Sequence, residues 1–320
     1  MARILVTGFS GQIGSYLVEQ LLADGHDVIG IGSPSDVFRG EVKPAKGSLD
    51  RVNSLLDENG ALDAVVHLAA RSSVSASWAD PMGTFDTNAR MAAAVAYGAA
   101  KRRLRLVHAS SAEIFGNAAS PVQDETTPIS PISPYAVAKA SAHLAVQLAR
   151  EGFGAPASNL IFYLGESPRR ASFFVFRKIT GTVAAIAAGA ASELVLGSTS
   201  VVRDFCHARD LASAARMLAL GAPAGDYICA SGEGHSILDV ATLACKIAGV
   251  PSSVIRANAP SLVRPNDVQS LIGDSRRLRT LGWRPSVGFE ELVREVLEYD
   301  TSLRSSARAA PQDSPRRNPP

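Results

Sequence analysis

Short apolar runs alternate with helix-like stretches through the first half of the chain. The runs are rich in Val, Ile, Leu and Ala and are bounded by polar or turn-forming residues, which is typical of buried strands. Between them, apolar residues recur three and four positions apart, as they do on one face of an amphipathic helix. We therefore predict strands at residues 3–6, 27–31, 64–68, 104–109 and 157–163, and helices at residues 14–24, 88–102 and 135–150.

Strands that alternate with helices form parallel βαβ units, with helices on both faces of one sheet. The sequence thus predicts an α/β fold with a doubly wound, Rossmann-like parallel sheet, whose ligands bind at the carboxyl ends of the strands. The alternation stops near residue 165. We predict one domain at residues 1–164, a smaller α/β substrate-binding lobe at residues 165–300 with returns to the main sheet, and a disordered tail at residues 301–320, which is rich in Ser, Arg, Ala and Pro.

Three glycines follow the first predicted strand at intervals of three: Gly8, Gly11 and Gly14. Between a strand and a helix, such glycines let the backbone approach a pyrophosphate, and the helix presents its free N–H groups to it. A glycine turn at this place is also an ordinary packing device. At the start of an alternating α/β chain we interpret it as dinucleotide binding, which makes residues 1–164 the dinucleotide-binding domain. The contacts expected here are Gly8, Ser10, Gly11, Gln12, Ile13 and Gly14.

Charge and cysteine content exclude several classes of protein. The 32 Lys and Arg nearly balance the 30 Asp and Glu, so the charge gives no basis for a nucleic-acid or membrane partner. The three cysteines, Cys206, Cys229 and Cys245, have neither metal-ligand nor disulfide spacing, so we expect no metal. Few cysteines, and a first strand that follows directly on the first residue, lead us to expect a cytoplasmic protein.

A tyrosine and a lysine stand four positions apart at the start of the helix predicted at residues 135–150. Tyr135 and Lys139 share one helix face, where an ammonium group lowers the pKa of a phenol and prepares it to take a proton from a hydroxyl. A pair with this spacing is also common on solvated helix faces. Upstream, the strand at residues 104–109 leads into Ser111 and Glu113, at the edge where ligands bind. Ser111 can bond the same hydroxyl, and Glu113 can act as a second acid or base; a loop cap and a helix-start charge are the alternatives.

Four motifs, taken in order, resemble the extended short-chain dehydrogenase/reductases, which are nucleotide-sugar epimerases and dehydratases. They are the glycine turn, the strand end His67–Ala70, the pair Ser110–Ser111, and Tyr135 with Lys139. Over residues 3–297 the chain resembles the GDP-mannose 4,6-dehydratases in particular. The stretches that carry this second resemblance are Glu166–Arg170, Phe174–Thr180, Arg203–Asp210 and Arg264–Asp274. The resemblance implies NAD or NADP as the cofactor, bound also by Leu68, Ala69 and Ala70.

The resemblance also implies a reaction on a nucleotide-diphosphate sugar. Tyr135 removes the proton of the C4 hydroxyl while C4 loses hydride; Glu113 then removes the acidified C5 proton and helps expel the C6 hydroxyl as water. Ser111 and Lys139 complete the catalytic set, and Tyr135 and Lys139 also contact the cofactor. A 4-epimerase or a 4-keto-6-deoxy-sugar reductase needs Ser111, Tyr135 and Lys139 alone, so these activities stay as alternatives. A non-catalytic dinucleotide binder is a further one.

Basic residues are needed to hold the diphosphate. The resemblance implies Arg203 and Arg264, whose planar guanidinium groups suit phosphate oxygens, and adds Lys178. For Arg203, an ion pair with Asp204 or Asp210 is the alternative.

Three features depart from the family pattern. Leu164–Gly165 replaces an Asn-His pair that touches the nucleotide, which leaves the identity of the sugar nucleotide open. Gly32 supplies no acid for the ribose of NAD, whereas Ser33 and Ser35 can receive a 2′-phosphate, which favours NADP. The segment at residues 32–64 is shorter than in family members, where it contributes to tetramer contacts, so we expect a homodimer or a homotetramer.

Overall fold

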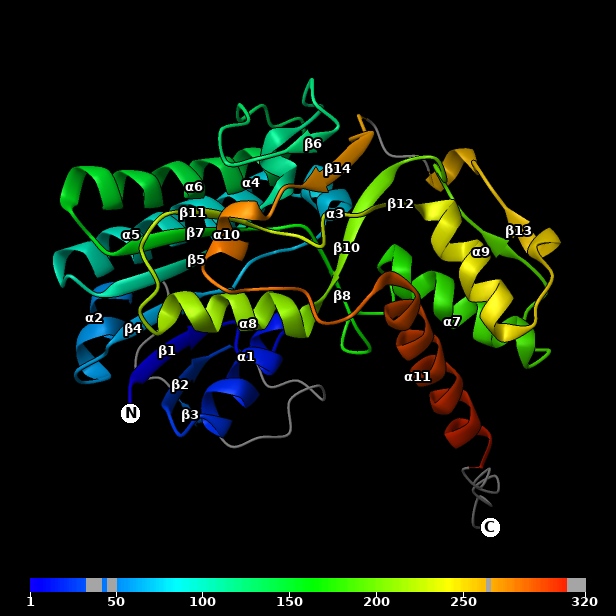
Figure 1. Ribbon diagram of the computed structural model, residues 1–320, viewed down its shortest axis with the longest axis horizontal. Helices are drawn as coiled ribbons and strands as arrows, with labels where there is room; N and C mark the ends of the chain where they lie inside the picture. The colour runs from blue at the N-terminus through cyan, green and yellow to red at the C-terminus, as the bar shows by residue number, and fades with distance from the viewer. Residues whose placement is uncertain (33–41, 45–50, 263–265, 310–320) are drawn as a thin grey trace, which may run out of the picture.

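The computed structural model describes residues 1–32, 42–44, 51–262 and 266–309 (Figure 1). Three residues to which the sequence gives binding roles, Ser33, Ser35 and Arg264, lie outside the described residues.

A parallel sheet forms the centre of the larger lobe. Its strands are β1 (Arg3–Thr7), β2 (Asp27–Ile31), β3 (Lys43–Pro44), β4 (Ala64–His67), β5 (Arg105–Ser111), β7 (Ala157–Phe162) and β11 (Asp226–Cys229). They are ordered β11-β7-β5-β4-β1-β2-β3, and all pairings are parallel (Figure 1). The chain leaves β1 toward β2 and then returns to β4 on the other side. Ligands bind at such a switch point in doubly wound folds, here between β1 and β4.

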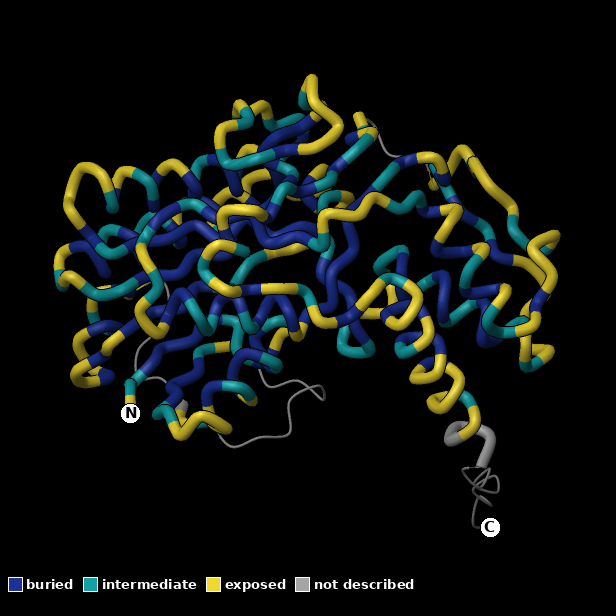
Figure 2. The backbone as a smooth tube through the Cα atoms, in the orientation of Figure 1, coloured by how far each residue is buried: buried dark blue, intermediate teal, exposed yellow. Residues whose placement is uncertain are grey.

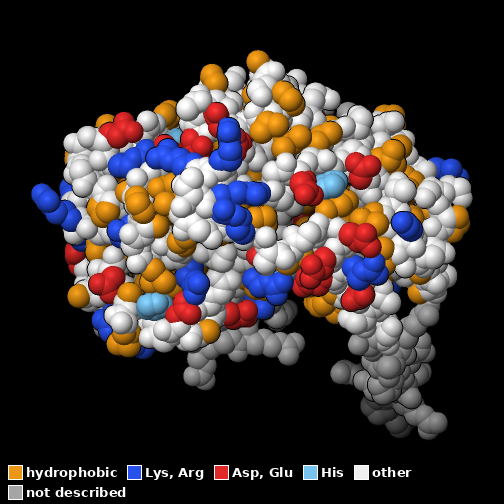
Figure 3. Space-filling model, viewed as in Figure 1, with side chains coloured by type: hydrophobic (Ala, Val, Ile, Leu, Met, Phe, Trp, Pro, Cys, Tyr) orange, Lys and Arg blue, Asp and Glu red, His pale blue; other side chains and the backbone are white. Residues whose placement is uncertain are grey.

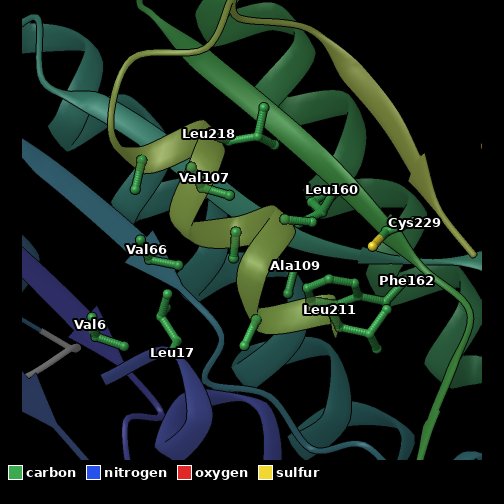
Figure 4. Packing of buried hydrophobic residues seen from close by; sticks show 14 of the residues in the cluster. Val6, Leu17, Val66, Val107, Ala109, Leu160, Phe162, Leu211, Leu218 and Cys229 are labelled. Carbon is green, nitrogen blue, oxygen red and sulfur yellow. The ribbon is translucent and has the colours of Figure 1, made fainter. Parts of the chain in front are cut away.

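Helices cover both faces of this sheet, so its central strands, β1, β4, β5 and β7, are buried along most of their length (Figure 2). One face carries α1 (Gln12–Ala23) and α8 (Ala208–Ala219). The other carries α2 (Val52–Glu58), α5 (Met91–Lys101) and α6 (Pro134–Phe153). On the first face, strand side chains that include Val6, Val66, Val107 and Leu160 pack against Leu17 of α1 and Leu211 and Leu218 of α8 (Figure 4).

The predicted strands and helices of the first half are confirmed, with shifts of one to three residues at several of their ends. Residues 88–102 begin as a π-helical turn, Asp86–Arg90, before α5, and this turn continues α3 (Val74–Ala79) and α4 (Pro81–Phe85). Strand β5 runs on to Ser111, two residues beyond its predicted end, because Ser110 and Ser111 still pair with β7. The hydroxyl groups of both serines are thus fixed to the rigid sheet.

The smaller lobe has its own core. A second sheet joins β6 (Val122–Gln123), β8 (Leu164–Glu166), β10 (Val202–His207), β12 (Gly234–Ser236) and β14 (Ser270–Gly273). Beside it, α7 (Val175–Ala187), α9 (Ile237–Ala248) and α11 (Phe289–Ala309) pack on one another (Figure 1). The remaining elements are β9 (Leu194–Val195) paired with β13 (Ile255–Arg256), α10 (Arg276–Thr280), and the short helices Ala112–Phe115, Ser252–Val254 and Pro260–Leu262.

Helix α11 continues past residue 301, where the sequence analysis begins a disordered tail. That expectation was wrong for residues 301–309, because composition does not show that the hydroxyl groups bond back into the helix. Thr301 and Ser302 donate to the carbonyl oxygens of Leu297 and Tyr299, and Arg304 donates to the carbonyl oxygen of Gly181 on α7. Residues 310–320 lie outside the described residues.

Acidic and basic side chains are interspersed over the face seen in Figure 3. In the part of the chain that the structure describes, no helix has both the length and the apolar character needed to cross a membrane. Nor do three or more His, Cys, Asp or Glu side chains of the described residues gather in a way that could hold a metal ion. Cys206, Cys229 and Cys245 are buried free thiols.

Candidate active site

The turn between β1 and α1 depends on two glycines. Gly8 has a φ of +71°, and a Cβ placed on it would lie 2.9 Å from the backbone nitrogen of Ala69. A Cβ on Gly14 would lie 2.1 Å from the carbonyl oxygen of Gly8, so the first turn of α1 packs directly on the loop. Gly11 is the N-cap and has no side chain, which leaves the helix to present its first N–H groups. A dinucleotide pyrophosphate fits this cradle.

The ends of β1 and β4 are joined across the switch point by the Thr7 hydroxyl. It lies 2.8 Å from Nδ1 of His67 and accepts a hydrogen bond from the amide of Ala69 at 3.2 Å. The amide of Leu68 donates to the carbonyl oxygen of Thr7. Leu68, Ala69 and Ala70 therefore lie beside Gly8, half-buried, which brings two of the predicted cofactor-binding segments together.

Ser111 and Tyr135 meet at the carboxyl end of the sheet. The Ser133 hydroxyl caps α6 and so fixes where the helix begins, and the amide of Tyr135 donates to the hydroxyl of Ser77 at 3.1 Å. The phenol of Tyr135 shares a side-chain hydrogen bond with Ser111, and each residue is 8% exposed. The hydroxyl pair predicted from the sequence is therefore assembled.

The pKa of Tyr135 is raised above 10, chiefly by burial, whereas the sequence analysis predicts that Lys139 lowers it. The ammonium group of Lys139 instead donates a hydrogen bond to the carbonyl oxygen of Ala109, and burial lowers its pKa to about 8. Helical spacing brings the two side chains to one face, but a main-chain oxygen of β5 captures the ammonium group.

Glu113 lies in the short helix Ala112–Phe115, directly after β5. Its amide donates to the Ser111 hydroxyl at 3.3 Å, which fixes its backbone beside the hydroxyl pair. The carboxylate is half-buried, and its negative charge raises the pKa of Tyr135. A second acid or base therefore stands within electrostatic reach of the phenol.

A segment of the smaller lobe, residues 166–170, is fastened to the start of α1. Gln12 donates to the hydroxyl of Ser167 at 3.0 Å and accepts from the guanidinium group of Arg170 at 3.2 Å. Arg169 donates to Ser15 and lies 3.8 Å over the ring of Tyr16. The positive charge of Arg170 also lowers the pKa of Tyr135. The segment thus connects the glycine turn with Tyr135.

Two of the residues proposed to bind the diphosphate, Arg203 and Lys178, lie on β10 and α7 of the smaller lobe. Arg203 is 4% exposed and forms an ion pair with Asp267 at 2.9 Å. Asp204 accepts hydrogen bonds from the backbone of Ser231, Gly232 and Gly273. Lys178 is half-buried on α7. A diphosphate would therefore have to share the Arg203 guanidinium group with Asp267.

Sequence reasoning missed Thr7 and Ser77, whose hydroxyl groups position the site. Thr7 carried a signal, because it is a polar residue that ends a fully buried strand next to Gly8. Ser77 carried none, since its bond to Tyr135 spans 58 residues.

A doubly wound sheet with a glycine turn at its switch point and Ser, Tyr and Lys at its carboxyl edge defines the extended short-chain dehydrogenase/reductases. The family model described as GDP-mannose 4,6 dehydratase matches residues 5–296. The chain belongs to this family.

Curated relatives agree with the family model. A GDP-mannose 4,6-dehydratase, sdnI, of Sordaria araneosa is 32% identical, over 95% of this chain and 62% of that protein. The chain thus spans less than two thirds of this relative. GDP-mannose 4,6 dehydratase 1 of Arabidopsis thaliana is 33% identical, over 93% of this chain and 90% of that protein.

Solved structures of nucleotide-sugar enzymes share the fold. The UDP-glucose 4-epimerase of Thermus thermophilus, in complex with NAD, has a TM-score of 0.82 at 27% identity and covers 93% of this chain and 98% of its own. DesIV, a dTDP-glucose 4,6-dehydratase from Streptomyces venezuelae with NAD and TYD bound, has a TM-score of 0.81 at 25% identity, over 95% of this chain and 98% of its own.

Proposed function

We propose that this chain is a GDP-mannose-type nucleotide-sugar 4,6-dehydratase, which forms a 4-keto-6-deoxy sugar by loss of water across C5 and C6. One observation supports dehydration in addition to family membership. The negative charge of Glu113 raises the pKa of the Tyr135 phenol, which is hydrogen-bonded to Ser111. An epimerase or a reductase requires the serine, tyrosine and lysine, whereas dehydration also requires a group that removes the C5 proton.

The cradle at Gly8 and Gly14, with Leu68, Ala69 and Ala70 beside it, is where we place NAD or NADP. A nicotinamide bound there would supply the hydride acceptor for C4 of the sugar and the hydride donor for C6. Gly32 follows β2 and carries no acid that would bond the ribose of NAD, which supports NADP. The binding constants of NAD and NADP, measured side by side, test this preference.

Tyr135 is the base that receives the proton of the C4 hydroxyl, and Ser111 holds that hydroxyl through its own. Burial raises the pKa of Tyr135, so the phenol carries its proton in this structure and needs nearby positive charge to act as a base. Arg170 supplies such a charge, and Lys139 is the candidate to bond the cofactor ribose.

Glu113 carries the elimination. Once C4 is a ketone, the neighbouring C5 proton is acidic because the carbanion is delocalised as an enolate. The Glu113 carboxylate takes this proton and passes it to the C6 hydroxyl, which leaves as water. The same group therefore acts first as a base and then as an acid.

For the substrate we propose Arg203 and Lys178 as contacts to the diphosphate, and also Arg264. The departure from the family pattern at Leu164–Gly165 supports a changed nucleotide contact. A Cβ on Gly165 would lie 2.6 Å from Cδ1 of Leu211, so a larger residue at this position would displace that side chain. A panel of nucleotide sugars tests recognition, since a ligand that binds the folded state raises the melting temperature.

We further propose a homodimer formed through α6. Its outer face exposes Val137, Leu144 and Leu148, which are 44%, 51% and 51% exposed. Helices α3 and α4 pack on α6 and expose Trp78 and Met82 nearby. Contiguous exposed apolar side chains of this kind are typical of interfaces. Light scattering on the purified protein tests the proposal: a dimer or tetramer supports it, and a monomer at all concentrations contradicts it.

The decisive experiment is turnover of GDP-mannose with product analysis. A dehydratase forms a 4-keto product without net consumption of cofactor. An epimerase accumulates no keto product, and a reductase consumes NADPH stoichiometrically. If Tyr135→Phe leaves every measured property unchanged, the chain is a dinucleotide binder.

A further inference from the structure

Helix α6 carries a histidine one turn beyond Lys139, on the same face as the catalytic tyrosine. Tyr135, Lys139 and His143 are 8%, 4% and 5% exposed. Positions four apart lie above one another on a helix, so the three side chains form one buried row against the sheet. The mechanism above uses the first two of them and leaves His143 without a role.

Each member of this row contacts the end of β5. Tyr135 bonds the side chain of Ser111, and Lys139 donates to the carbonyl oxygen of Ala109. Nδ1 of His143 lies 3.0 Å from Oγ of Ser110, in a fully buried contact. The histidine therefore touches the residue directly before the catalytic serine.

His143 is held from its other side as well. Its Nε2 lies 3.8 Å from Oδ2 of Asp226, the first residue of β11. Arg150 fixes this carboxylate with two hydrogen bonds, of 2.9 and 2.8 Å. Asn159 of β7 donates to both Asp226 and the carbonyl oxygen of His143. A chain of contacts thus runs from the edge strand of the sheet to Ser110.

The surroundings keep the imidazole neutral. Burial lowers the pKa of His143, the charge of Arg150 lowers it further, and Asp226 opposes them. His108 on β5 also faces this cluster, and burial holds its pKa well below 6.5. The imidazole of His143 therefore acts through its hydrogen bonds rather than through charge.

We propose that His143 is a positioning residue for the reaction: its contact with Ser110 sets α6 against β5 and thereby places the Tyr135 phenol on Ser111. A helix and a strand joined by side-chain bonds at three successive levels cannot slide past one another. If one bond is removed, two buried polar groups lose their partner and the helix can shift. The inference rests on the catalytic roles proposed above.

The test compares His143→Leu with His143→Asn in the full-length protein. The amide of Asn reaches the position of Nδ1 and can donate or accept, so His143→Asn keeps the contact with Ser110, whereas Leu loses it. We expect kcat of His143→Leu to fall about ten- to a hundredfold, as for a small displacement of reacting groups, with KM for the nucleotide sugar and Kd for the cofactor unchanged. His143→Asn restores most of kcat.

A purely structural role would give a different result. Val146→Ala creates a small cavity on α6 next to His143 and is the matched control, because Val146 is buried and contacts no catalytic group. It should lower the melting temperature with kcat unchanged. If His143→Leu behaves like Val146→Ala, or if His143→Asn does not recover activity, the positioning role is refuted.

A double-mutant cycle with Ser110→Ala measures the contact directly. If the two side chains act as one unit, the double variant His143→Leu/Ser110→Ala has nearly the kcat of the more impaired single variant. If the two single-variant losses in kcat instead multiply in the double variant, the side chains act independently and the proposal is contradicted. Wild-type protein that lacks dehydratase activity refutes the proposed function instead, so the two failures are distinguishable.

Discussion

The ammonium group of Lys139 donates a hydrogen bond to the carbonyl oxygen of Ala109, the residue two positions before Ser111. The lysine therefore joins α6 to β5, the strand that carries Ser111. Burial lowers the pKa of Lys139 to about 8, from 10.5, and this shift has a consequence for stability.

A group whose pKa is lowered by folding stabilises the folded state above its unfolded pKa and loses that contribution as pH falls. Relative to Lys139→Met, wild-type protein should therefore gain up to about 3 kcal/mol of unfolding free energy between pH 8 and pH 10.5. Urea titrations across this range measure the difference. Lys101→Met, which replaces an exposed lysine at the end of α5, is the control. If the difference in unfolding free energy between wild type and Lys139→Met does not change with pH, the burial of Lys139 is contradicted.

Replacement of Gly14 by Ala should weaken cofactor binding more than tenfold, because the new Cβ would meet the carbonyl oxygen of Gly8 at 2.1 Å and force the loop from the helix. Gly288→Ala is the control, since a Cβ there would meet nothing within 4 Å. Isothermal titration with NAD and NADP gives both constants. Equal losses in the two variants would show that the close packing of α1 on the turn is not what shapes the site.

Because Arg177 and Asp300 form a buried ion pair, we predict that the part of α11 around Asp300 is needed for the stability of the fold. The two side chains are 6% and 5% exposed, and Arg177 also donates to the carbonyl oxygens of Pro168 and Arg170. Asp300→Ala leaves a buried guanidinium group unpaired and should cost about 3–5 kcal/mol of stability. Ser302→Ala, on the exposed side of the helix, should change the unfolding free energy by less than about 0.5 kcal/mol. Similar values for both variants would contradict the prediction.

Local chain geometry explains what was predictable from the sequence. The alternation of strands and helices, the glycine spacing at Gly8 and Gly14, and the shared helix face of Tyr135 and Lys139 all depend on residues a few positions apart. The structure contains each of them, and the sheet order follows from the known behaviour of βαβ units.

Partners far apart in the chain were not predictable. Lys139 bonds Ala109 across 30 residues, and Arg203 pairs with Asp267 across 64. Many carbonyl oxygens and carboxylates compete for each cation, and only the packed structure selects among them. The helical extension of α11 was missed for a related reason, since its polar composition gave no sign of the contacts with α7.

Glu113→Gln should separate oxidation from elimination. The amide cannot take the C5 proton, so dehydration should fall by at least about a hundredfold. Oxidation at C4 depends on Tyr135 and should persist in part, so that reduced cofactor builds up in a single turnover. Absorbance of reduced nicotinamide in stopped flow records this build-up. Undiminished dehydration in the variant would remove Glu113 from the mechanism.

The most direct test of the central claim is the fate of GDP-mannose with purified wild-type protein and catalytic NADP or NAD. We predict a 4-keto-6-deoxy product, seen by mass spectrometry as the loss of one water, with the cofactor returned to its oxidised form. A product of unchanged mass, or one that appears only with stoichiometric NADPH, would contradict the account.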